Sequence, residues 1–319
     1  MRKDISFCLN DAYVNFCYIT IYSILENKKS SDEFVFHLLT DFISDKNTSK
    51  IEALVNDYNA EVKFYEIDKK RFEGLNMNFS VYAWFRILIP EVIDSSIKKV
   101  LYLDCDTIVD NNLDALFNID ISGKSIACAI DREAFNSETF ERLEYDSELK
   151  YVCTGVMMMN ADYWRNNSIG NKVYNFGKEN PSKCVFADQD AINYICRATK
   201  MLLPLKYGII NNYFSESYRY EKNEVLEAVE TPVIIHYAGN APWKYSRNFH
   251  FFGDKWWSYK KRVNLGFMNN ITRTYIKTMF VYYRRLLMFV FFKLKPYPYK
   301  RPEMISRDEV LNRLNVKQI

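Results

Sequence analysis

The chain has 319 residues, of which 48% are hydrophobic and 16% aromatic, so it can bury a large core and is not a disordered protein. Seven cysteines, an odd number, lie mostly inside apolar runs, which indicates reduced buried thiols and excludes a disulfide-based secreted domain. The start, MRKDISFCLND, lacks the apolar region of a signal peptide. We therefore expect a protein that stays on the cytosolic side.

The first 130 residues alternate between segments typical of strands and segments typical of helices. We predict strands at 5–9, 34–40, 60–67 and 99–103, and helices at 13–27, 44–58 and 81–89, the last of them ended by Pro90. The strand KVLYL at 99–103 is apolar throughout, as expected of a strand buried in a parallel sheet. The alternation favours an α/β fold with helices on both faces of the sheet.

The pattern is looser in the second half of the chain. We predict strands at 125–131, 155–160 and 232–239, and helices at 168–180 and 188–200. The sequence contains no internal repeat and no Pro-, Gly- or Ser-rich linker before residue 255. We therefore predict that residues 1–254 form one domain.

Two aspartates, Asp104 and Asp106, directly follow the apolar strand KVLYL. Residues i and i+2 of a strand point to the same side, so both carboxylates can reach one ion. The carboxyl ends of central strands are where open α/β sheets bind ligands. Adjacent carboxylates repel unless a cation lies between them, and oxygen ligands suit Mg²⁺ or Mn²⁺. The alternative is a pair of exposed loop carboxylates with no ligand.

A histidine, one of only three in the chain, ends the apolar strand at 232–239 within HYAGNAPW. A nitrogen ligand from His236 together with two aspartates would favour Mn²⁺ over Mg²⁺. Gly239 would let the backbone approach a phosphate closely. The alternative is a histidine that merely occupies a turn.

The segment DQDAIN places Asp188, Gln189 and Asp190 at a predicted helix start. These residues either cap the helix and favour its dipole, or they line a pocket for a hydroxylated ligand.

Residues 255–302 contain twelve lysines and arginines and no acidic residue. The apolar run Leu286–Phe292 is far shorter than the roughly 20 residues that span a bilayer. Basic residues interleaved with aromatic ones fit an interfacial helix on an anionic membrane. Packing on the core, dimerisation and nucleic-acid binding are the alternatives, of which nucleic acid is the least favoured. We predict that residues 255–319 form a helical segment for peripheral membrane attachment.

Six motifs, in order over residues 4–250, resemble those of glycosyltransferase family 8, especially the bacterial lipopolysaccharide galactosyl- and glucosyltransferases. They are FCLNDAYV, YAWFRILIPE, KVLYLDCDTIV, CTGVMMMN, DQDAIN and HYAGNAPW. Cys153 and Thr154 replace the family's usual Asn and small residue, which leaves donor choice open. The last motif is one residue shorter and lacks the family's phosphate-binding Lys, for which Lys244 could substitute.

The resemblance implies a GT-A fold with a mainly parallel central sheet, and transfer of galactose or glucose from a UDP-sugar with retention of configuration. Asp104, Asp106 and His236 would bind Mn²⁺, with Mg²⁺ as the alternative. The acceptor would be lipopolysaccharide or another lipid-linked glycan at the inner leaflet, where the tail would hold a cytoplasmic enzyme. Further contacts to the nucleotide sugar would come from Cys8, Asn10, Tyr13, Arg86, Cys105, Asp131, Cys153, Thr154, Asp188, Gln189, Gly239 and Lys244.

Retention through a covalent intermediate would require a carboxylate nucleophile on the far face of the sugar. The residue expected there is Gln189, an amide and a poor nucleophile. The sequence therefore favours attack by the acceptor from the leaving-group side, with Gln189 stabilising the transition state. Asp190 is the weaker candidate for a nucleophile.

Two other functions compete with this interpretation. DCDTIV also resembles the Asp-x-Asp-x-Thr motif of haloacid-dehalogenase-type phosphatases, but that motif follows the first strand of its domain, and here about 100 residues precede it. The missing Lys and the Cys153–Thr154 pair could also mark a nucleotide-sugar-binding protein without turnover.

Overall fold

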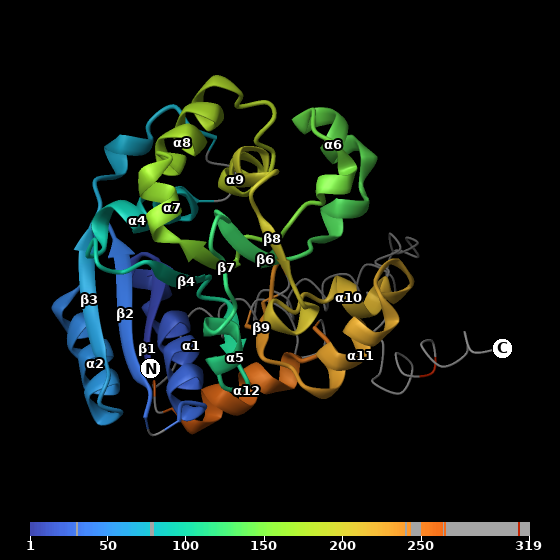
Figure 1. Ribbon diagram of the computed structural model, residues 1–319. Coiled ribbons are helices and arrows are strands. Elements are labelled where there is room, and N and C mark those ends of the chain that lie inside the picture. The colour runs from blue at the N-terminus through green and yellow to red at the C-terminus, as the bar shows by residue number, and fades with distance from the viewer. Residues whose placement is uncertain are drawn as a thin grey trace, which may run out of the picture.

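A seven-stranded mixed sheet forms the centre of the protein in this computed structural model, which describes residues 1–29, 31–76, 80–239, 241–243, 250–263, 265 and 312 (Figure 1). The strands, in spatial order, are β3 (Glu61–Glu66), β2 (Glu33–Thr40), β1 (Arg2–Cys8), β4 (Lys99–Leu103), β7 (Val156–Asn160), β6 (Ile126–Ala129) and β8 (Met201–Leu203). β7 runs antiparallel to both of its neighbours, and the other pairs are parallel. The predicted α/β fold with a mainly parallel sheet is confirmed.

Helices cover both faces of the sheet (Figure 1). Their buried apolar side chains form two large hydrophobic clusters with those of the strands. The longer helices are α1 (Val14–Glu26), α2 (Asp45–Asp57), α6 (Ser137–Leu143), α7 (Ala161–Asn166), α8 (Ile169–Glu179), α9 (Asp188–Cys196), α11 (Lys222–Glu230) and α12 (Gly253–Arg262). The shorter ones are α3 (Val81–Phe85), α4 (Ile89–Val92), α5 (Asp114–Phe117) and α10 (Asn212–Ser215). One cluster contains the buried residues of α1, and the other contains those of α8 and α9.

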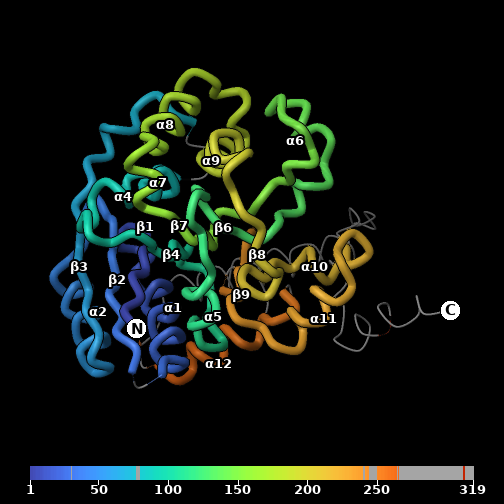
Figure 2. The backbone as a smooth tube through the Cα atoms, in the orientation of Figure 1, coloured from blue at the N-terminus to red at the C-terminus, as the bar shows by residue number. Residues whose placement is uncertain are grey.

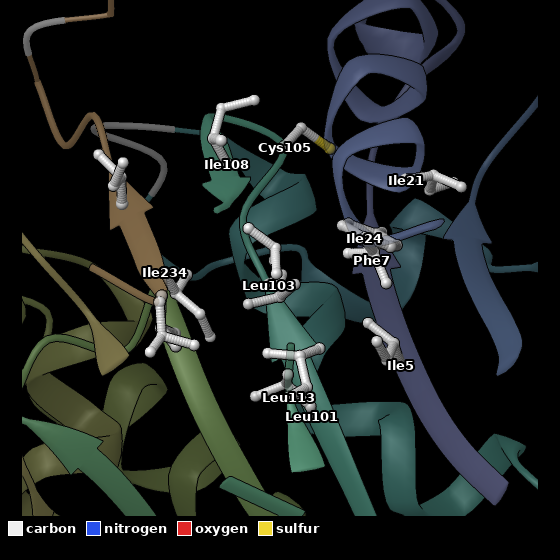
Figure 3. Close-up of a cluster of buried hydrophobic side chains, with 14 of the residues drawn as sticks. Ile5, Phe7, Ile21, Ile24, Leu101, Leu103, Cys105, Ile108, Leu113 and Ile234 are labelled. Atoms are coloured by element: carbon white, nitrogen blue, oxygen red, sulfur yellow. The ribbon is translucent and has the colours of Figure 1, made fainter. Parts of the chain in front are cut away.

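The strand β4 lies in the middle of the sheet, and its apolar residues explain its position. Val100, Leu101 and Leu103 are 0% exposed, because β4 has neighbouring strands on both sides and packed layers above and below. Figure 3 shows Leu101 and Leu103 beside Ile5 and Phe7 of β1, consistent with the pairing of Ile5 with Leu101. Parallel β1 and β4 end at the same edge of the sheet, so the residues after β4 face the turn after β1.

A separate two-stranded sheet pairs β5 (Thr107–Val109) with β9 (Ile234–His236) in antiparallel orientation. Its register places Thr107 opposite His236, and the Tyr237 amide donates to the Asp106 carbonyl at 2.9 Å. The sequence did not predict β5, because three residues are too few to show a strand period. This pairing brings the end of β9 to the Asp104–Asp106 turn.

Two predicted helices differ clearly from the structure. The segment predicted as one helix at 81–89 consists of α3, the 3₁₀ turn Arg86–Leu88 and the start of α4. Pro90 does not end a helix: it is the second residue of α4, within the first turn, where a missing amide hydrogen costs no intrahelical bond. The helix predicted at 188–200 ends at Cys196. The prediction of reduced thiols is confirmed, because all seven cysteines are free and buried.

The predicted domain boundary at 254/255 falls inside α12, which packs against α1 (Figures 1 and 2). Trp256 is fully buried, with its ring 5.0 Å from that of Trp243. The Tyr259 hydroxyl accepts from the side-chain amide of Asn27 at 2.8 Å. The beginning of the basic segment is therefore an integral part of the core.

The rest of the segment 255–319 after α12, apart from residues 263, 265 and 312, lies outside the described residues. Its predicted helix and membrane role remain predictions. In the described part of the chain, no helix has the length and apolar character needed to cross a membrane.

Replacing Trp256 with alanine should lower the free energy of unfolding by about 3–5 kcal/mol, because it leaves a large cavity between α12 and α1. The measurement is urea unfolding of the full chain followed by tryptophan fluorescence. Lys261→Ala on the exposed side of the same helix is the control and should change stability little. A loss below about 1 kcal/mol for Trp256→Ala would contradict the integral role of α12.

Candidate active site

Three potential metal ligands converge where β4 ends. Asp104 and Asp106 follow β4, and His236 ends β9; their ligand atoms all lie within 4.8 Å of one another. The Nε2 atom of His236 is 3.6 Å from Asp104 Oδ2 and 3.3 Å from Asp106 Oδ1. Both carboxylates are about three-quarters buried, and His236 is almost completely buried. The pairing of β5 with β9 thus supplies the third ligand to the two on the β4 turn.

The electrostatics of this cluster favour a bound cation. Burial opposes a charge on His236, but Cys153 and Asp106 raise its pKa well above the usual range. A proton on the imidazole is one way to neutralise the facing carboxylates, and a divalent ion is another. Two carboxylates and one imidazole form a donor set that suits Mn²⁺ and accommodates Mg²⁺ less well. The residues therefore fit the metal that the sequence predicts.

Gly155 supplies the space that the cluster needs. A Cβ atom on this residue would lie 2.1 Å from His236 Cε1 and 2.6 Å from Asp104 Oδ2. Its carbonyl also accepts from the Asp104 amide at 2.8 Å, which fixes the first aspartate in position. Any side chain at this position would displace two of the three ligands.

Arg86 lies in the 3₁₀ turn Arg86–Leu88 and links both sides of the site. Its Nη2 atom is 3.3 Å from Asp104 Oδ1, and its Nε atom is 2.9 Å from Asp188 Oδ2. Its Nη1 atom donates to the carbonyl and hydroxyl of Thr154 at 2.9 and 3.2 Å. Although burial disfavours its charge, Asp104 and Asp188 raise the pKa of the guanidinium. Arg86 is therefore a permanent positive charge between two carboxylates.

Asp188, the first residue of α9, is 2% exposed and faces Arg86. Burial raises the pKa of its carboxyl group to about 7, while the Arg86 charge opposes this shift. Such a perturbed carboxyl group beside a potential metal centre is typical of a functional site. Its position agrees with the predicted role in holding a sugar hydroxyl, which remains a prediction.

Gln189 is held beside the loop before β7. Its Oε1 atom accepts from the Thr154 amide at 3.0 Å and from the Thr154 hydroxyl at 3.3 Å. Since Thr154 also contacts Arg86, the side chain of Gln189 has a fixed place close to the charged cluster.

Asp190 is fully buried away from this cluster. Its Oδ2 atom accepts from Arg142 and from the Phe186 amide, both at 2.7 Å. Its Oδ1 atom accepts from the Tyr151 hydroxyl at 2.7 Å. Because both oxygens have partners within the protein, we assign Asp190 to bracing the start of α9 and not to attack on a sugar.

The turn after β1 carries the residues predicted to meet the nucleotide. Cys8 is the buried last residue of β1, and the Asn10 side chain caps the 3₁₀ turn by accepting from the Tyr13 amide at 3.1 Å. The Tyr13 ring is 37% exposed and is available for stacking on a base. Cys105 is buried, with its sulfur pointing toward α1 (Figure 3).

The remaining predicted residues lie at two other places. Gly239 adopts a φ of +72°, the left-handed conformation that favours glycine, just after His236. Asp131 follows β6 and is buried, which raises its pKa. Cys153 precedes β7, and its sulfur is 3.4 Å from His236 Nδ1. Lys244 lies outside the described residues.

Tyr102 on β4 also belongs to the site, although no motif in the sequence predicted it. Its hydroxyl donates to Asp104 Oδ1, and its ring lies under the Arg86 guanidinium at 4.5 Å. The alternation of strand residues could have identified it, because Tyr102 lies two residues before Asp104 and points to the same side.

The sheet and its Asp-x-Asp turn define the class of protein: the chain has the GT-A fold of nucleotide-sugar transferases. The structure aligns with that of galactosyltransferase LgtC, solved in complex with donor and acceptor sugar analogs, with a TM-score of 0.75 at 20% identity, covering 82% of this chain and 97% of LgtC. The chain belongs to glycosyl transferase family 8, whose family model matches residues 4–247.

Two curated relatives are similar over most of their own length. General stress protein A of Bacillus subtilis is 28% identical over 273 residues, covering 81% of this chain and 94% of that protein. A lipopolysaccharide 1,2-glucosyltransferase of Escherichia coli is 27% identical over 247 residues, covering 75% and 73% respectively. The family match does not favour the phosphatase interpretation, and the aspartates follow the fourth strand along the chain, not the first.

Replacing Gly155 with alanine should weaken Mn²⁺-dependent UDP binding by about 10- to 100-fold, because the new Cβ collides with His236 and Asp104. Gly155 is not among the residues with positive φ, so alanine fits its backbone and the effect reports on space alone. Calorimetry measures the binding, and far-UV circular dichroism checks the fold. Unchanged binding would contradict the placement of the ligands.

Proposed function

We propose that the protein transfers a hexose, galactose or glucose, from a UDP-sugar to a glycan acceptor with retention of configuration. The observation that carries this proposal is the convergence of Asp104, Asp106 and His236 at the carboxyl edge of β4. Family membership supports the reaction class.

The metal, held by these three residues, would supply Lewis-acid stabilisation of the charge that develops on UDP. Arg86 would keep Asp104 oriented through its ion pair. Tyr13, exposed beside the turn after β1, would stack on the uracil. No atom of the described residues lies within 4 Å of the position that a Cβ atom would take on Gly239. This glycine would therefore leave room for a phosphate near the backbone.

The sugar would lie over Gln189 and Asp188. Gln189 cannot form a good covalent intermediate, because an amide is a weak nucleophile, and Asp190 is buried with both oxygens occupied. Attack by the acceptor from the leaving-group side therefore agrees best with these residues, with the Gln189 amide stabilising positive charge on the sugar.

The acceptor is proposed to be lipopolysaccharide or another lipid-linked surface glycan. Relatives named as lipopolysaccharide glucosyl- and galactosyltransferases support this choice. Such an acceptor lies at the inner leaflet, so the protein would act in the cytoplasm with its basic tail on the membrane surface.

The principal test is a donor screen with Mn²⁺ that measures UDP release from UDP-glucose, UDP-galactose and their N-acetyl forms. We expect one hexose donor to dominate. Asp106→Asn should reduce release by about 100-fold or more, because it removes a charged ligand from the metal that stabilises the leaving group.

Asp57→Asn, on the exposed end of α2, is the matched control and should retain full activity. UDP binding without turnover of any donor would indicate the inactive binding protein. Hydrolysis of p-nitrophenyl phosphate, with no UDP release, would indicate the phosphatase.

Truncation after residue 265 should release the protein from vesicles that contain anionic lipid, while α12 and the catalytic domain remain intact. Co-sedimentation measures binding, and the bound fraction of the full chain should fall as salt is added. If the truncated protein still sedimented with the vesicles, the tail would not be the attachment site.

A further inference from the structure

Cys153 occupies a position between the metal cluster and the end of β6. It is one of seven buried thiols, but it is the one for which the structure gives a sulfur contact to His236, at 3.4 Å from Nδ1. Asp131 lies on its other side: burial raises the pKa of the Asp131 carboxyl group, and the nearby Cys153 thiol opposes this shift. Cys153 therefore contacts the potential metal ligand His236 and lies near a second buried carboxyl group, that of Asp131.

Backbone hydrogen bonds hold the segments that carry Asp131 and Cys153 next to each other. Residues 130 and 152 form an antiparallel bridge between the segments after β6 and before β7. The Asp131 amide donates to the Tyr151 carbonyl at 2.9 Å, and the Cys153 amide donates to the Ala129 carbonyl at 3.0 Å. Asp131 and Cys153 are thus neighbours on adjacent extended segments.

Metal binding by His236 would determine which atoms donate in the hydrogen bonds between His236, Cys153 and Asp131. His236 Nε2 faces Asp104 and Asp106, so a metal ion there requires the lone pair of Nε2. The ring proton must then lie on Nδ1, which donates to the sulfur of Cys153. The S–H group in turn donates to the Asp131 carboxylate.

We propose that Cys153 is a positioning residue that orients His236 for the metal and connects it to Asp131. Metal-bound histidines commonly donate their second nitrogen to a carboxylate or carbonyl, and loss of this partner costs about 10- to 100-fold in metal affinity. In this chain a thiol is inserted between the histidine and the carboxylate. The proposal rests on the metal site of the proposed function.

The test compares Mn²⁺ affinity, measured by electron paramagnetic resonance with UDP present, in the full chain and its variants. Cys153→Ala should weaken Mn²⁺ binding by about tenfold or more. Cys153→Ser, whose hydroxyl both accepts and donates, should restore most of the affinity. Cys196→Ala removes an equally buried thiol from α9 and should leave Mn²⁺ binding unchanged.

A second measurement detects the hydrogen bond itself. The chain has only three histidines, so ¹⁵N-histidine labelling resolves their ring signals by NMR. Because Mn²⁺ is paramagnetic, Cd²⁺ replaces it in this experiment. A slowly exchanging Nδ1–H proton of His236 should appear in the unmodified protein and in Cys153→Ser, and should be lost in Cys153→Ala. If Cys153 only filled space in the core, the Nδ1–H signal of His236 would remain in Cys153→Ala.

A double variant tests the connection to Asp131. If the three residues act as one unit, Asp131→Asn should add little to the loss of Mn²⁺ affinity caused by Cys153→Ala. Equal affinity in the unmodified protein and Cys153→Ala, or a Cys153→Ser variant as weak as Cys153→Ala, would overturn the proposal. Absence of Mn²⁺ binding in the unmodified protein would instead overturn the metal site of the proposed function.

Discussion

The ion pairs of Arg86 are the interaction on which the rest of the site depends. Asp104 and Asp188 are carboxyl groups on different elements, and both face one buried guanidinium. Without it, both carboxylates would lose their fixed opposite charge, and the pKa of Asp188, which burial already raises, would rise further. The same guanidinium lies on the Tyr102 ring and donates to Thr154, which holds Gln189. One guanidinium therefore supports both the proposed metal ligand Asp104 and the proposed sugar-binding residues Asp188 and Gln189.

Much of the fold could be predicted because burial leaves a clear pattern in the sequence. β4 was predicted with its observed bounds, since a central strand covered on both faces must be apolar throughout. The three-residue strands β5 and β8 could not be predicted, because they are too short to show a period. The helix α12 was assigned to the basic tail, because its three lysines and one arginine give it the composition of the tail and conceal the buried Trp256 and Tyr259.

The site was only partly predictable for a different reason. Strand alternation predicted that Asp104 and Asp106 point to one side. His236 was joined to them only through the family resemblance, because that contact depends on the pairing of β5 with β9. The bracing role of Asp190 was equally hidden, since its partner Arg142 belongs to α6, a helix with no clear signal in the sequence. Contacts between distant segments follow from topology, and local pattern carries little information about them.

The pairing of β5 with β9 also has a consequence for folding. The two aspartates come from the first half of the chain, and the histidine arrives only when β9 is in place near the end of the described domain. A chain that ends before β9 would lack the third ligand, and a partly folded chain would hold its ligands apart. The complete ligand set is thus a property of the finished domain, so an ion that prefers it stabilises the native state selectively. Through this pairing, binding of an ion at the proposed site would be thermodynamically linked to completion of the fold.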